Sequence, residues 1–460
     1  MEKPTTSTLH RLPVEILHIV FANLKPQDVT QVRLTCGSLA DIALHHLVSE
    51  VHLVFTSSSF ERMRQISRHP IVSKTVRSLF YEAEVIQRCH TSYTWAKCID
   101  NPTMLANLAA TRPRNRNSPA FLRDLPCRRC SVKELDRAYA NYSQYAADQQ
   151  MIIRNDHNSD LIQDAFSKFP NLDTIHMVRE REMCECSRYL VREFEAGLRI
   201  PHGKQFSQVA CGVSQLLSLL LGAVSTGRKL RRVTCDRVHW TFFTQRREVL
   251  ADTHLAVEHL NYLRLRIATC RQGLHSCRDD AMCANLRHGS LRDFIAAAPH
   301  LKGLNIGANP IYRYLPPISL ADAVGTRHWQ YLERVNFAYL STREEDLLDF
   351  CDSHAKNLVH LSIIGLTLTS GCWQRVFQQI RKTLRLRSAK VSGLLSSYDF
   401  EDEHDLDEHW AGFSPEVARK PRLRVAIEAY LLEGGDAAPM NLNPASYKPD
   451  DDKDVLKWLC

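Results

Sequence analysis

The sequence predicts an α/β protein in which a short N-terminal module of three helices precedes an irregular tandem array of helices and strands. Two observations predict this class. Residues 12–47 contain three amphipathic segments separated by proline, glycine and serine. Farther along, the pattern Leu-x-x-apolar-x-apolar occurs six times between residues 172 and 363, and a helical pattern precedes each copy. Tandem units of this kind favour a solenoid, because each unit buries its apolar face only by stacking on its neighbours.

The first predicted element is the helical module at residues 12–47. Pro13 and Pro26 each suit the first position of a helix, and Glu15 and Asp28 place negative charge in the first turns. A Gly-Ser pair then separates the third helix from the second. The apolar positions at helical spacing are Ile16, Leu17, Val20, Phe21, Leu24, Val29, Val32, Leu34, Leu39, Ile42, Ala43 and Leu47. Three helices of about 36 residues in total are too few to bury a stable core alone, so the rest of the chain or a partner must cover part of this surface.

The order of residues in this module resembles the F-box family. The matching residues are Leu12, Pro13, Glu15, Ile16, Leu17, Val20, Phe21, Leu24, Asp28, Val29, Arg33, Leu34, Cys36 and Ala43. The resemblance implies a module that inserts into a Skp-family adaptor, which links it to a cullin scaffold and to the ubiquitin-transfer machinery. The adaptor-binding residues that it implies are Leu12, Pro13, Glu15, Ile16, Val20, Leu24, Asp28, Val29 and Cys36.

The chain departs from the family at one place in the module. Gly37-Ser38-Leu39 follows the cysteine, where the family commonly has a basic pair and an aromatic residue. The alternative to an F-box is an amphipathic helical cap that packs on the following domain.

Between the module and the repeats, strands and helices are predicted to alternate. Residues 51–55 and 76–80 are predicted strands, with a helix at about residues 59–68 between them, and together they are similar to a first, irregular repeat. Residues 110–126 are rich in Arg, Asn and Pro and lack an apolar period, so we expect an exposed loop. A further helix is predicted at residues 132–150.

The six copies of the leucine pattern are predicted to be strands. They begin at Leu172, Leu230, Leu260, Leu301, Leu332 and Leu358. The last four positions of each copy alternate between apolar and polar residues, as a strand with one buried face requires. The helices predicted before them include residues 161–169, 215–224, 291–298 and 344–354. The alternative is an α/β domain of another topology, because a doubly wound sheet also alternates helices with strands.

The repeats resemble the divergent leucine-rich repeats that follow the F-box in many fungal F-box proteins. In a solenoid, the strand face forms a concave surface that suits recognition of one protein partner. Polar strand positions on this surface include Arg232, Arg264, Arg334 and His360, which are the candidate substrate-binding residues. Guanidinium groups pair well with carboxylate and phosphate oxygens, so an acidic or phosphorylated protein substrate is indicated. The alternative is that these are ordinary solvated arginines.

The composition is that of an ordinary globular chain, with 460 residues, 44% hydrophobic and 24% charged. The N-terminus carries charge and proline where a secretory signal needs an apolar run, and no stretch of about 18 apolar residues is present. We therefore expect a cytoplasmic or nuclear protein without a membrane partner. The net charge of +8 is dispersed over short basic runs without interleaved aromatic residues, which argues against a nucleic-acid partner.

No catalytic motif can be assembled from the sequence. Residues 197–204 approach the pattern of a phosphate-binding loop, but five residues separate the glycines where four are required, and Gln205 replaces the Ser or Thr. Cys127 and Cys130 have zinc-knuckle spacing. The conceivable partners are Cys184 and Cys186, with a second loose cluster of Cys270, Cys277 and Cys283. Zinc sites normally present two well-spaced pairs, so we expect thiols, no metal and no cofactor.

The sequence thus divides into a disordered tail at 1–8, an F-box at 9–50, connecting strands and helices at 51–150, a leucine-rich-repeat-like substrate-recognition region at 151–395 and an acidic C-terminal segment and tail at 396–460. The expected function is that of a non-catalytic substrate-recognition subunit of a Skp–cullin–F-box ubiquitin ligase. Such a subunit acts by proximity, because it holds a substrate lysine near the ubiquitin-conjugating enzyme. The alternatives are a scaffold that binds the adaptor without directing ubiquitination, and an enzyme with a site hidden in the C-terminal region.

Overall fold

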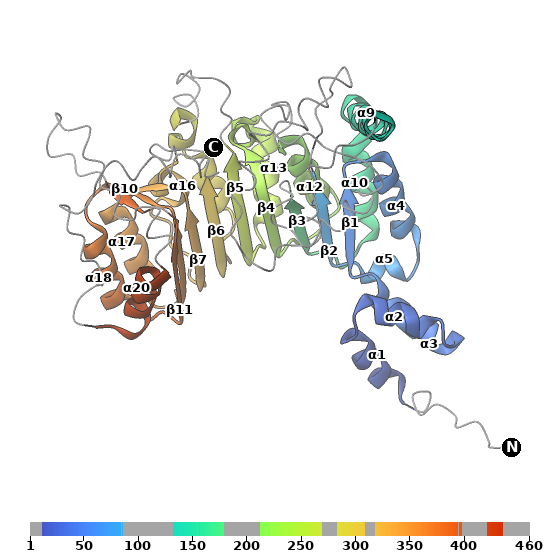
Figure 1. Ribbon diagram of the computed structural model, residues 1–460, viewed down its shortest axis with the longest axis horizontal. Coiled ribbons are helices and arrows are strands. Elements are labelled where there is room, and N and C mark those ends of the chain that lie inside the picture. The colour runs from blue at the N-terminus through green and yellow to red at the C-terminus, as the bar shows by residue number, and fades with distance from the viewer. Residues whose placement is uncertain are drawn as a thin grey trace.

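The computed structural model describes the chain in several stretches. The described residues are 12–83, 85, 132–155, 157–178, 212–268, 283–308, 318–393, 395–397 and 421–435. They form a helical module at the N-terminal end and a mixed α/β body built on a long parallel sheet (Figure 1).

Three short helices make up the N-terminal module. They are α1 (Val14–Ala22), α2 (Pro26–Arg33) and α3 (Gly37–Leu47). Pro26 begins α2 as predicted, where its missing N–H breaks no helical hydrogen bond. Pro13 lies one residue earlier than predicted, at the N-cap of α1. Glu15 and Asp28 lie in the first turns of their helices, where negative charge is favourable.

Within the described residues, nine strands form a parallel sheet whose spatial order is their order in the chain. They are β1 (Glu50–Val54), β2 (Ser78–Glu82), β3 (Thr174–Val178), β4 (Arg232–His239), β5 (Tyr262–Ala268), β6 (Gly303–Ala308), β7 (Arg334–Ala338), β9 (His360–Ile364) and β11 (Ser388–Ser392). A doubly wound sheet reverses its strand order part-way across. The doubly wound alternative is therefore wrong.

Helices form the second layer of the body. They are α4 (Ser57–Arg68), α5 (Val72–Thr75), α9 (Val132–Asn155), α10 (His157–Lys168), α12 (Val213–Ser225), the 3-10 helix η3 (Trp240–Thr244), α13 (Arg247–Val257), α15 (Ser290–Ala296), α16 (Leu320–Val324), α17 (Glu344–Ser353), α18 (Trp373–Thr383) and α20 (Pro421–Glu433). A continuous series of contacts leads from α4 through α10, α12 and α13 to α20. Because right-handed crossovers that always step in one direction leave every helix on the same side, the helices cover one face of the sheet (Figure 1).

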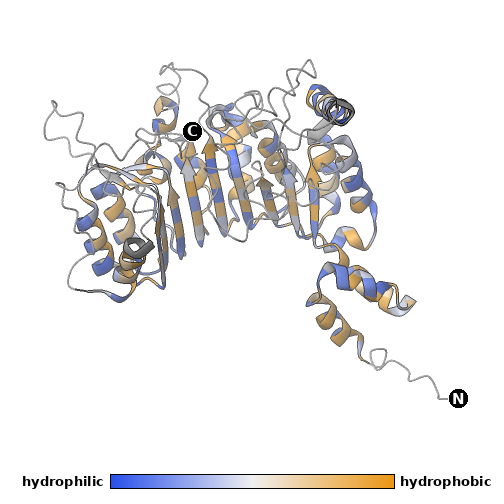
Figure 2. Ribbon diagram, viewed as in Figure 1, coloured by the Kyte–Doolittle hydropathy of each residue, from blue (hydrophilic) through white to orange (hydrophobic). Residues whose placement is uncertain are grey.

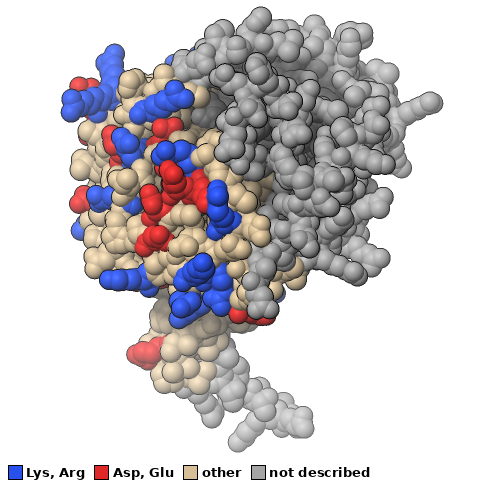
Figure 3. Space-filling view, turned by 90° about the vertical axis from the view of Figure 1, so that its left-hand side faces the viewer, with Lys and Arg blue, Asp and Glu red and all other residues tan. Residues whose placement is uncertain are grey.

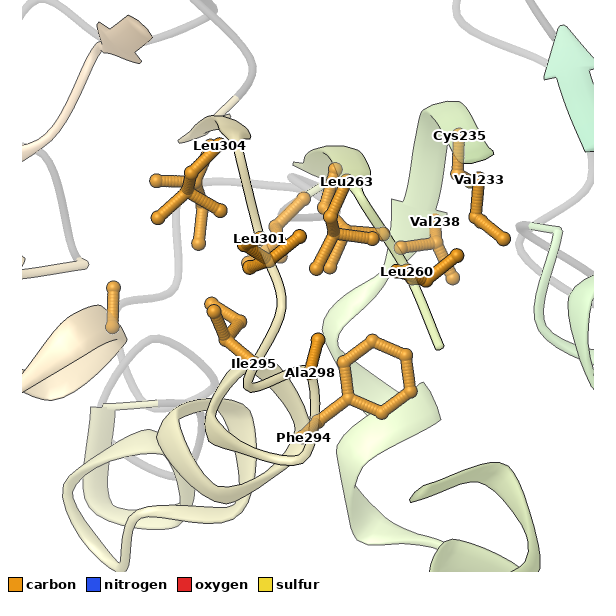
Figure 4. Packing of buried hydrophobic residues seen from close by; sticks show 14 of the residues in the cluster. Val233, Cys235, Val238, Leu260, Leu263, Phe294, Ile295, Ala298, Leu301 and Leu304 are labelled. Carbon is orange, nitrogen blue, oxygen red and sulfur yellow. The ribbon is translucent and has the colours of Figure 1, made fainter. Parts of the chain in front are cut away.

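The hydrophobic core lies between the sheet and the helical layer. Strand residues alternate, so that in β5 Leu263 and Leu265 are buried while Tyr262 is partly exposed. This alternation is visible as stripes along the strands in Figure 2. Figure 4 shows Phe294 and Ile295 of α15 pointing toward buried side chains of the neighbouring strands. Apolar contact with the helical layer therefore holds each strand in place.

The predicted leucine pattern has a clear structural meaning. The first leucine of each copy is buried and lies two residues before a strand, at the corner where the chain enters the sheet. The six strands predicted from this pattern are confirmed as β3, β4, β5, β6, β7 and β9. The strands predicted at 51–55 and 76–80 appear as β1 and β2, shifted by one or two residues.

A second sheet was not predicted. It is parallel and consists of β8 (Ser341–Arg343), β10 (Thr367–Ser370) and β12 (Ser396–Ser397). Each of these strands follows a strand of the main sheet after a turn with positive φ, at Tyr339 (54°), Gly365 (55°) and Gly393 (74°). Tyr339 is the one non-glycine residue with positive φ among the described residues. Left-handed backbone costs a residue with a side chain about 1–2 kcal/mol.

Several sequence predictions lie outside the described residues. They are the tail at 1–8, the loop at 110–126, residues 197–204, Cys127, Cys130, Cys184, Cys186, Cys270 and Cys277. The predicted boundary between residues 150 and 151 falls inside α9, and α20 is an unpredicted helix within the segment 396–460. No described helix has both the length and the apolar content that a membrane crossing requires.

Candidate interaction surfaces

The three helices of the N-terminal module share a small core. Its buried residues are Leu17, Phe21, Val29, Leu39 and Ala43. Partly buried residues pack around it, namely Val20, Leu24, Val32, Cys36, Ile42 and Leu47. A core of this size leaves much of the apolar surface of the helices uncovered.

The uncovered apolar surface is concentrated at the start of the chain. Leu12, Val14, Ile16, Ile19 and Leu34 expose between 39% and 77% of their surface. They are half of the ten large apolar residues that are exposed in the described part of the chain. Single exposed apolar residues are normal, but a concentration of them marks an interaction surface. Figure 2 shows the apolar character of α1.

The structure divides the predicted adaptor-binding residues into three groups. The exposed group is Leu12, Pro13, Glu15, Ile16 and Asp28. The group packed partly against the module core is Val20, Leu24 and Cys36. Val29 is fully buried, so its side chain holds α2 in the module. Sequence reasoning missed Val14 and Ile19, two further exposed apolar residues of α1.

Two histidines connect α1 to α3. The His18 Nδ1 and His46 Nε2 atoms lie 2.9 Å apart, and the ring of His46 lies edge-on to Phe21. Burial lowers the pKa of His46, and the neighbouring His18 and His45 lower it further. A neutral His46 ring suits this hydrogen bond, because a neutral imidazole has one nitrogen that donates and one that accepts.

The polar face of the main sheet carries the predicted substrate-binding residues. Strand register places Arg232, Arg334 and His360 in one row, at the first residues of β4, β7 and β9. Arg264 lies in the next row, two residues along β5 from the first. The structure therefore brings all four side chains to one face of the sheet in two pairs. Arg232 and Arg264 lie on the neighbouring strands β4 and β5, Arg334 and His360 lie on the neighbouring strands β7 and β9, and β6 lies between the pairs.

These side chains differ in their contacts. Arg232 places its guanidinium carbon 4.8 Å from the centre of the Tyr262 ring, which is a cation–π contact. Arg264 Nη2 lies 2.9 Å from Asp236 Oδ1, an ion pair in which both side chains are largely buried. Arg334 is exposed. Arg264 is thus partly neutralised by a described neighbour, while Arg232 and Arg334 face solvent.

Sequence reasoning missed two charged residues on this face. Arg266 lies on the same face of β5 as Arg264, and burial together with Arg264 lowers the pKa of Arg266 to about 10, so it is a cation at neutral pH. Burial raises the pKa of Asp236, although both arginines oppose the rise. Arg266 could have been predicted from the sequence, because apolar and polar residues continue to alternate in β5 for one position beyond the six-residue leucine pattern.

Stacked rings occupy the same face at the first strands. His52 stacks on Phe80 and Phe80 on His176, with centroids 5.1 and 4.3 Å apart. His176 Nδ1 lies 2.7 Å from Thr234 Oγ1. Burial, with help from nearby arginines, lowers the pKa of His176 to about 4, and burial lowers that of His52. This end of the face is therefore an uncharged ring platform at neutral pH.

Charge at the other end of the body is mixed. Figure 3 shows basic and acidic side chains interspersed on the end of the molecule where α17 and α18 lie. Ion pairs there join Arg343 to Asp346 at 2.7 Å and Arg375 to Glu344 at 3.0 Å. On this end the charges form no single basic patch among the described residues.

Comparison with known protein families decides what the N-terminal module is. Residues 9–53 match the family model of the F-box-like domain. The chain carries an F-box-like domain. The match covers α1, α2, α3 and most of β1, and it implies an adaptor role with a Skp-type partner. No curated protein matches the chain.

Metal ligands and thiols are the remaining candidates for a chemical site in the body outside the F-box-like domain. Within the described ranges, no group of three His, Cys, Asp or Glu side chains is placed to hold a metal ion. Cys283, which belongs to the predicted second cysteine cluster, is partly buried and forms no disulfide.

Proposed function

We propose that the chain is the substrate-recognition subunit of a Skp–cullin–F-box ubiquitin ligase. The F-box-like domain at residues 9–53 supports adaptor binding. The observation that carries the proposal is the exposed apolar surface formed by Leu12, Val14, Ile16 and Ile19. Because burying a large apolar side chain contributes about 1.5–3 kcal/mol, an adaptor that covers this surface gains much of its affinity from it.

The body supports the second half of the proposal, a leucine-rich-repeat-like region of the fungal type. Strands in chain order, with helices on the opposite face, are what stacked helix–strand repeats produce. We assign the substrate to the polar strand face, where Arg232, Arg264, Arg334 and His360 lie. Guanidinium groups on this face favour an acidic or phosphorylated target.

The mechanism that we propose is proximity. The chain binds a substrate at the strand face of the body and the adaptor at the N-terminal F-box-like domain. A cullin attached to the adaptor then brings the charged ubiquitin-conjugating enzyme close to a substrate lysine, which raises the effective concentration of the reactants. The chain contributes no catalytic group, and it acts in the cytoplasm or the nucleus.

Replacing Ile16 and Ile19 by aspartate tests adaptor binding. Both side chains are exposed, so the module core stays intact, while two carboxylates cannot enter an apolar interface without a large desolvation cost. We expect the affinity of the full chain for a purified Skp-family adaptor to fall by about tenfold or more. Leu255→Asp on α13 is the matched control, because Leu255 is apolar and similarly exposed. Unchanged adaptor binding by the double variant would overturn the proposal.

Capture of a cullin separates this function from that of a scaffold that binds the adaptor alone. The intact chain should co-purify adaptor and cullin together and should promote ubiquitination of captured proteins. The variant with Ile16→Asp and Ile19→Asp should lose both the co-purification of adaptor and cullin and the ubiquitination of captured proteins. Adaptor binding without a cullin would favour the scaffold.

Charge reversal tests the substrate face. Arg232→Glu with Arg334→Glu changes two exposed side chains on one row, so folding should be unaffected. We expect a changed set of captured substrates with unchanged adaptor binding. The same set of substrates in both proteins would argue against this face.

A further inference from the structure

A second row of side chains crosses the polar face, two residues farther along the strands than the row of Arg232. We name it the central row. Strand register connects its members in the order His52, Phe80, His176, Thr234, Arg264, Asn305, Asn336, Ser362 and Lys390. The row begins with stacked rings, passes an arginine near its middle and continues with amide and hydroxyl groups.

The middle of the central row contains buried polar atoms that have no hydrogen-bond partner in the part of the chain that the structure describes. They are Arg264 Nε, Asn305 Oδ1, Asn336 Oδ1 and Ser362 Oγ. Asn305 exposes 8% of its surface. Because buried polar atoms without partners are costly and rare in native proteins, four of them on successive strands indicate a surface that a ligand completes.

Two glycines shape the sheet on either side of Asn305. A Cβ on Gly303 would lie 2.6 Å from the Tyr262 ring, and a Cβ on Gly307 would overlap the Arg266 guanidinium. The Tyr262 and Arg266 side chains therefore lie over the backbone of β6, where a larger residue would displace them. An aromatic ring and a cation thus border Asn305 along its own strand.

Charge at this place is unbalanced. Arg264 and Arg266 share one nearby carboxylate, that of Asp236, and Asp236 Oδ1 lies against Arg264 Nη2. Among the described residues Arg266 has no ion-pair partner, and its Nη1 atom is buried without a hydrogen bond. Counting only described side chains, the centre of the face therefore holds one guanidinium without its own carboxylate, close to the amide of Asn305.

We propose that the central row binds an extended, acidic segment of a protein partner. One carboxylate or phosphate of the segment lies between Arg264 and Arg266, and its adjoining main chain lies on Asn305, Asn336 and Ser362. Guanidinium groups offer N–H donors that match the oxygens of either anion. An asparagine amide has both a donor and an acceptor, as a peptide group has. This inference rests on the proposed function, because it specifies what the substrate face recognises.

The spacing of the row fits an extended peptide that crosses the strands. Neighbouring strands lie about 4.8 Å apart, so Arg264 and Ser362 are about 14 Å apart, the length of about four extended residues. In the other direction His176 lies two strands from Arg264, a distance of about three extended residues. The rings of His176 and Phe80 there offer a stacking surface. The segment should therefore carry an apolar or aromatic residue about three positions from its acidic residue.

Peptide pools test this inference. The full chain is immobilised and exposed to three pools of peptides of about twelve residues, enough to span the row, that are degenerate except for a central phosphoserine, glutamate or serine. We expect retention of an acidic pool and not of the serine pool, and the comparison of the two acidic pools identifies the preferred anion. The retained peptides should be enriched in apolar or aromatic residues on one side of the anion. Equal retention of all three pools would overturn the inference.

Substitutions locate the bound anion. Arg266→Gln removes the guanidinium that has no described carboxylate of its own and should weaken binding of the retained acidic peptides by about tenfold or more. Arg264→Lys keeps the charge beside Asp236 but loses the planar fork, so it should remain folded and bind less tightly than the unaltered chain. Lys356→Gln is the matched control, because it removes one positive charge from an exposed site after α17. The melting temperature of each variant separates lost binding from lost folding.

Adaptor binding keeps the two proposals distinguishable. If Arg266→Gln and Lys356→Gln bind the acidic peptides equally, the inference about the central row is wrong, while adaptor capture still supports the proposed function. If the chain binds acidic peptides but captures no adaptor, the proposed function is wrong, while the inference that the central row binds an acidic segment is still supported.

Discussion

Single residues on the polar strand face are held in defined protonation states by burial. His176 lies between the ring of Phe80 and the hydroxyl of Thr234, and its pKa is lowered to about 4. A histidine in the unfolded chain has a pKa of about 6.5. The native structure therefore contains neutral His176, and lowering the pH decreases the stability of this structure through His176.

The stability of the protein should fall as the pH decreases from about 6.5 to 4. In this range the unfolded chain binds protons at histidine while folded His176 does not, so protons stabilise the unfolded state. His176→Phe keeps a ring on Phe80 and removes the titration, so the free energy of unfolding should depend less on pH. Denaturant unfolding at several pH values measures this dependence.

Denaturant unfolding at pH 8 is the control for His176→Phe. His176 is neutral there in both states, so any difference reports the lost contact with Thr234, about 1 kcal/mol. Parallel stability curves for the two proteins between pH 6.5 and 4 would contradict the assigned role of His176.

At the scale of elements, strands with one buried face were predictable because their period of two is visible in the sequence. The six leucine patterns each lead into a strand, since the leucine fills the corner before it. Strands β8, β10 and β12 have two to four residues each, too few for a period to appear. Helix α18 was missed although Trp373, Val376, Phe377 and Ile380 form a regular buried stripe.

The candidate site was predictable in part for the same reason. Alternation along the strands was sufficient to place Arg232, Arg264, Arg334 and His360 on one face. The sequence pattern contains no information about which residues of different strands lie side by side. The central row depends on that register, so the position of Arg266 beside Asn305 required the structure.

The helices of the F-box-like domain divide their apolar residues between a core and an exposed surface, and Val29→Ala tests this division. Val29 is fully buried, so truncation should destabilise the domain by about 1–3 kcal/mol. Hydrogen exchange of the amides in α1, α2 and α3 should then become faster.

Val14→Ala is the matched control for Val29→Ala. It is the same chemical change at an exposed position, so it should alter stability by no more than about 0.5 kcal/mol and should weaken adaptor binding instead. Equal exchange rates in the two variants would contradict the division into core and surface.

At the scale of the whole molecule, the described sheet has two ends, and the chain covers them differently. Beside β1, helix α3 of the F-box-like domain contacts α5. Beside β11, helix α20 packs on the last strand, and Val391 N–H donates a hydrogen bond of 3.0 Å to Glu428 Oε1. Uncovered edge strands pair with other chains, and stacked repeats need a cap at their end. Helix α20 therefore acts as the cap of the sheet.

Ile427→Asp should remove this cap. Ile427 is fully buried, and an unpaired carboxylate in its place carries a desolvation cost of several kcal/mol, so α20 should detach from β11. The amide of Val391 should then exchange faster, and light scattering should report association through the uncovered edge.

Val425→Asp on the same helix is the matched control, since Val425 is 53% exposed and its substitution should leave the exchange of the Val391 amide unchanged. Adaptor binding should survive in both variants, because the F-box-like domain lies at the opposite end of the sheet (Figure 1). Protection of Val391 that is equal in both variants would show that the edge of β11 is stable without α20.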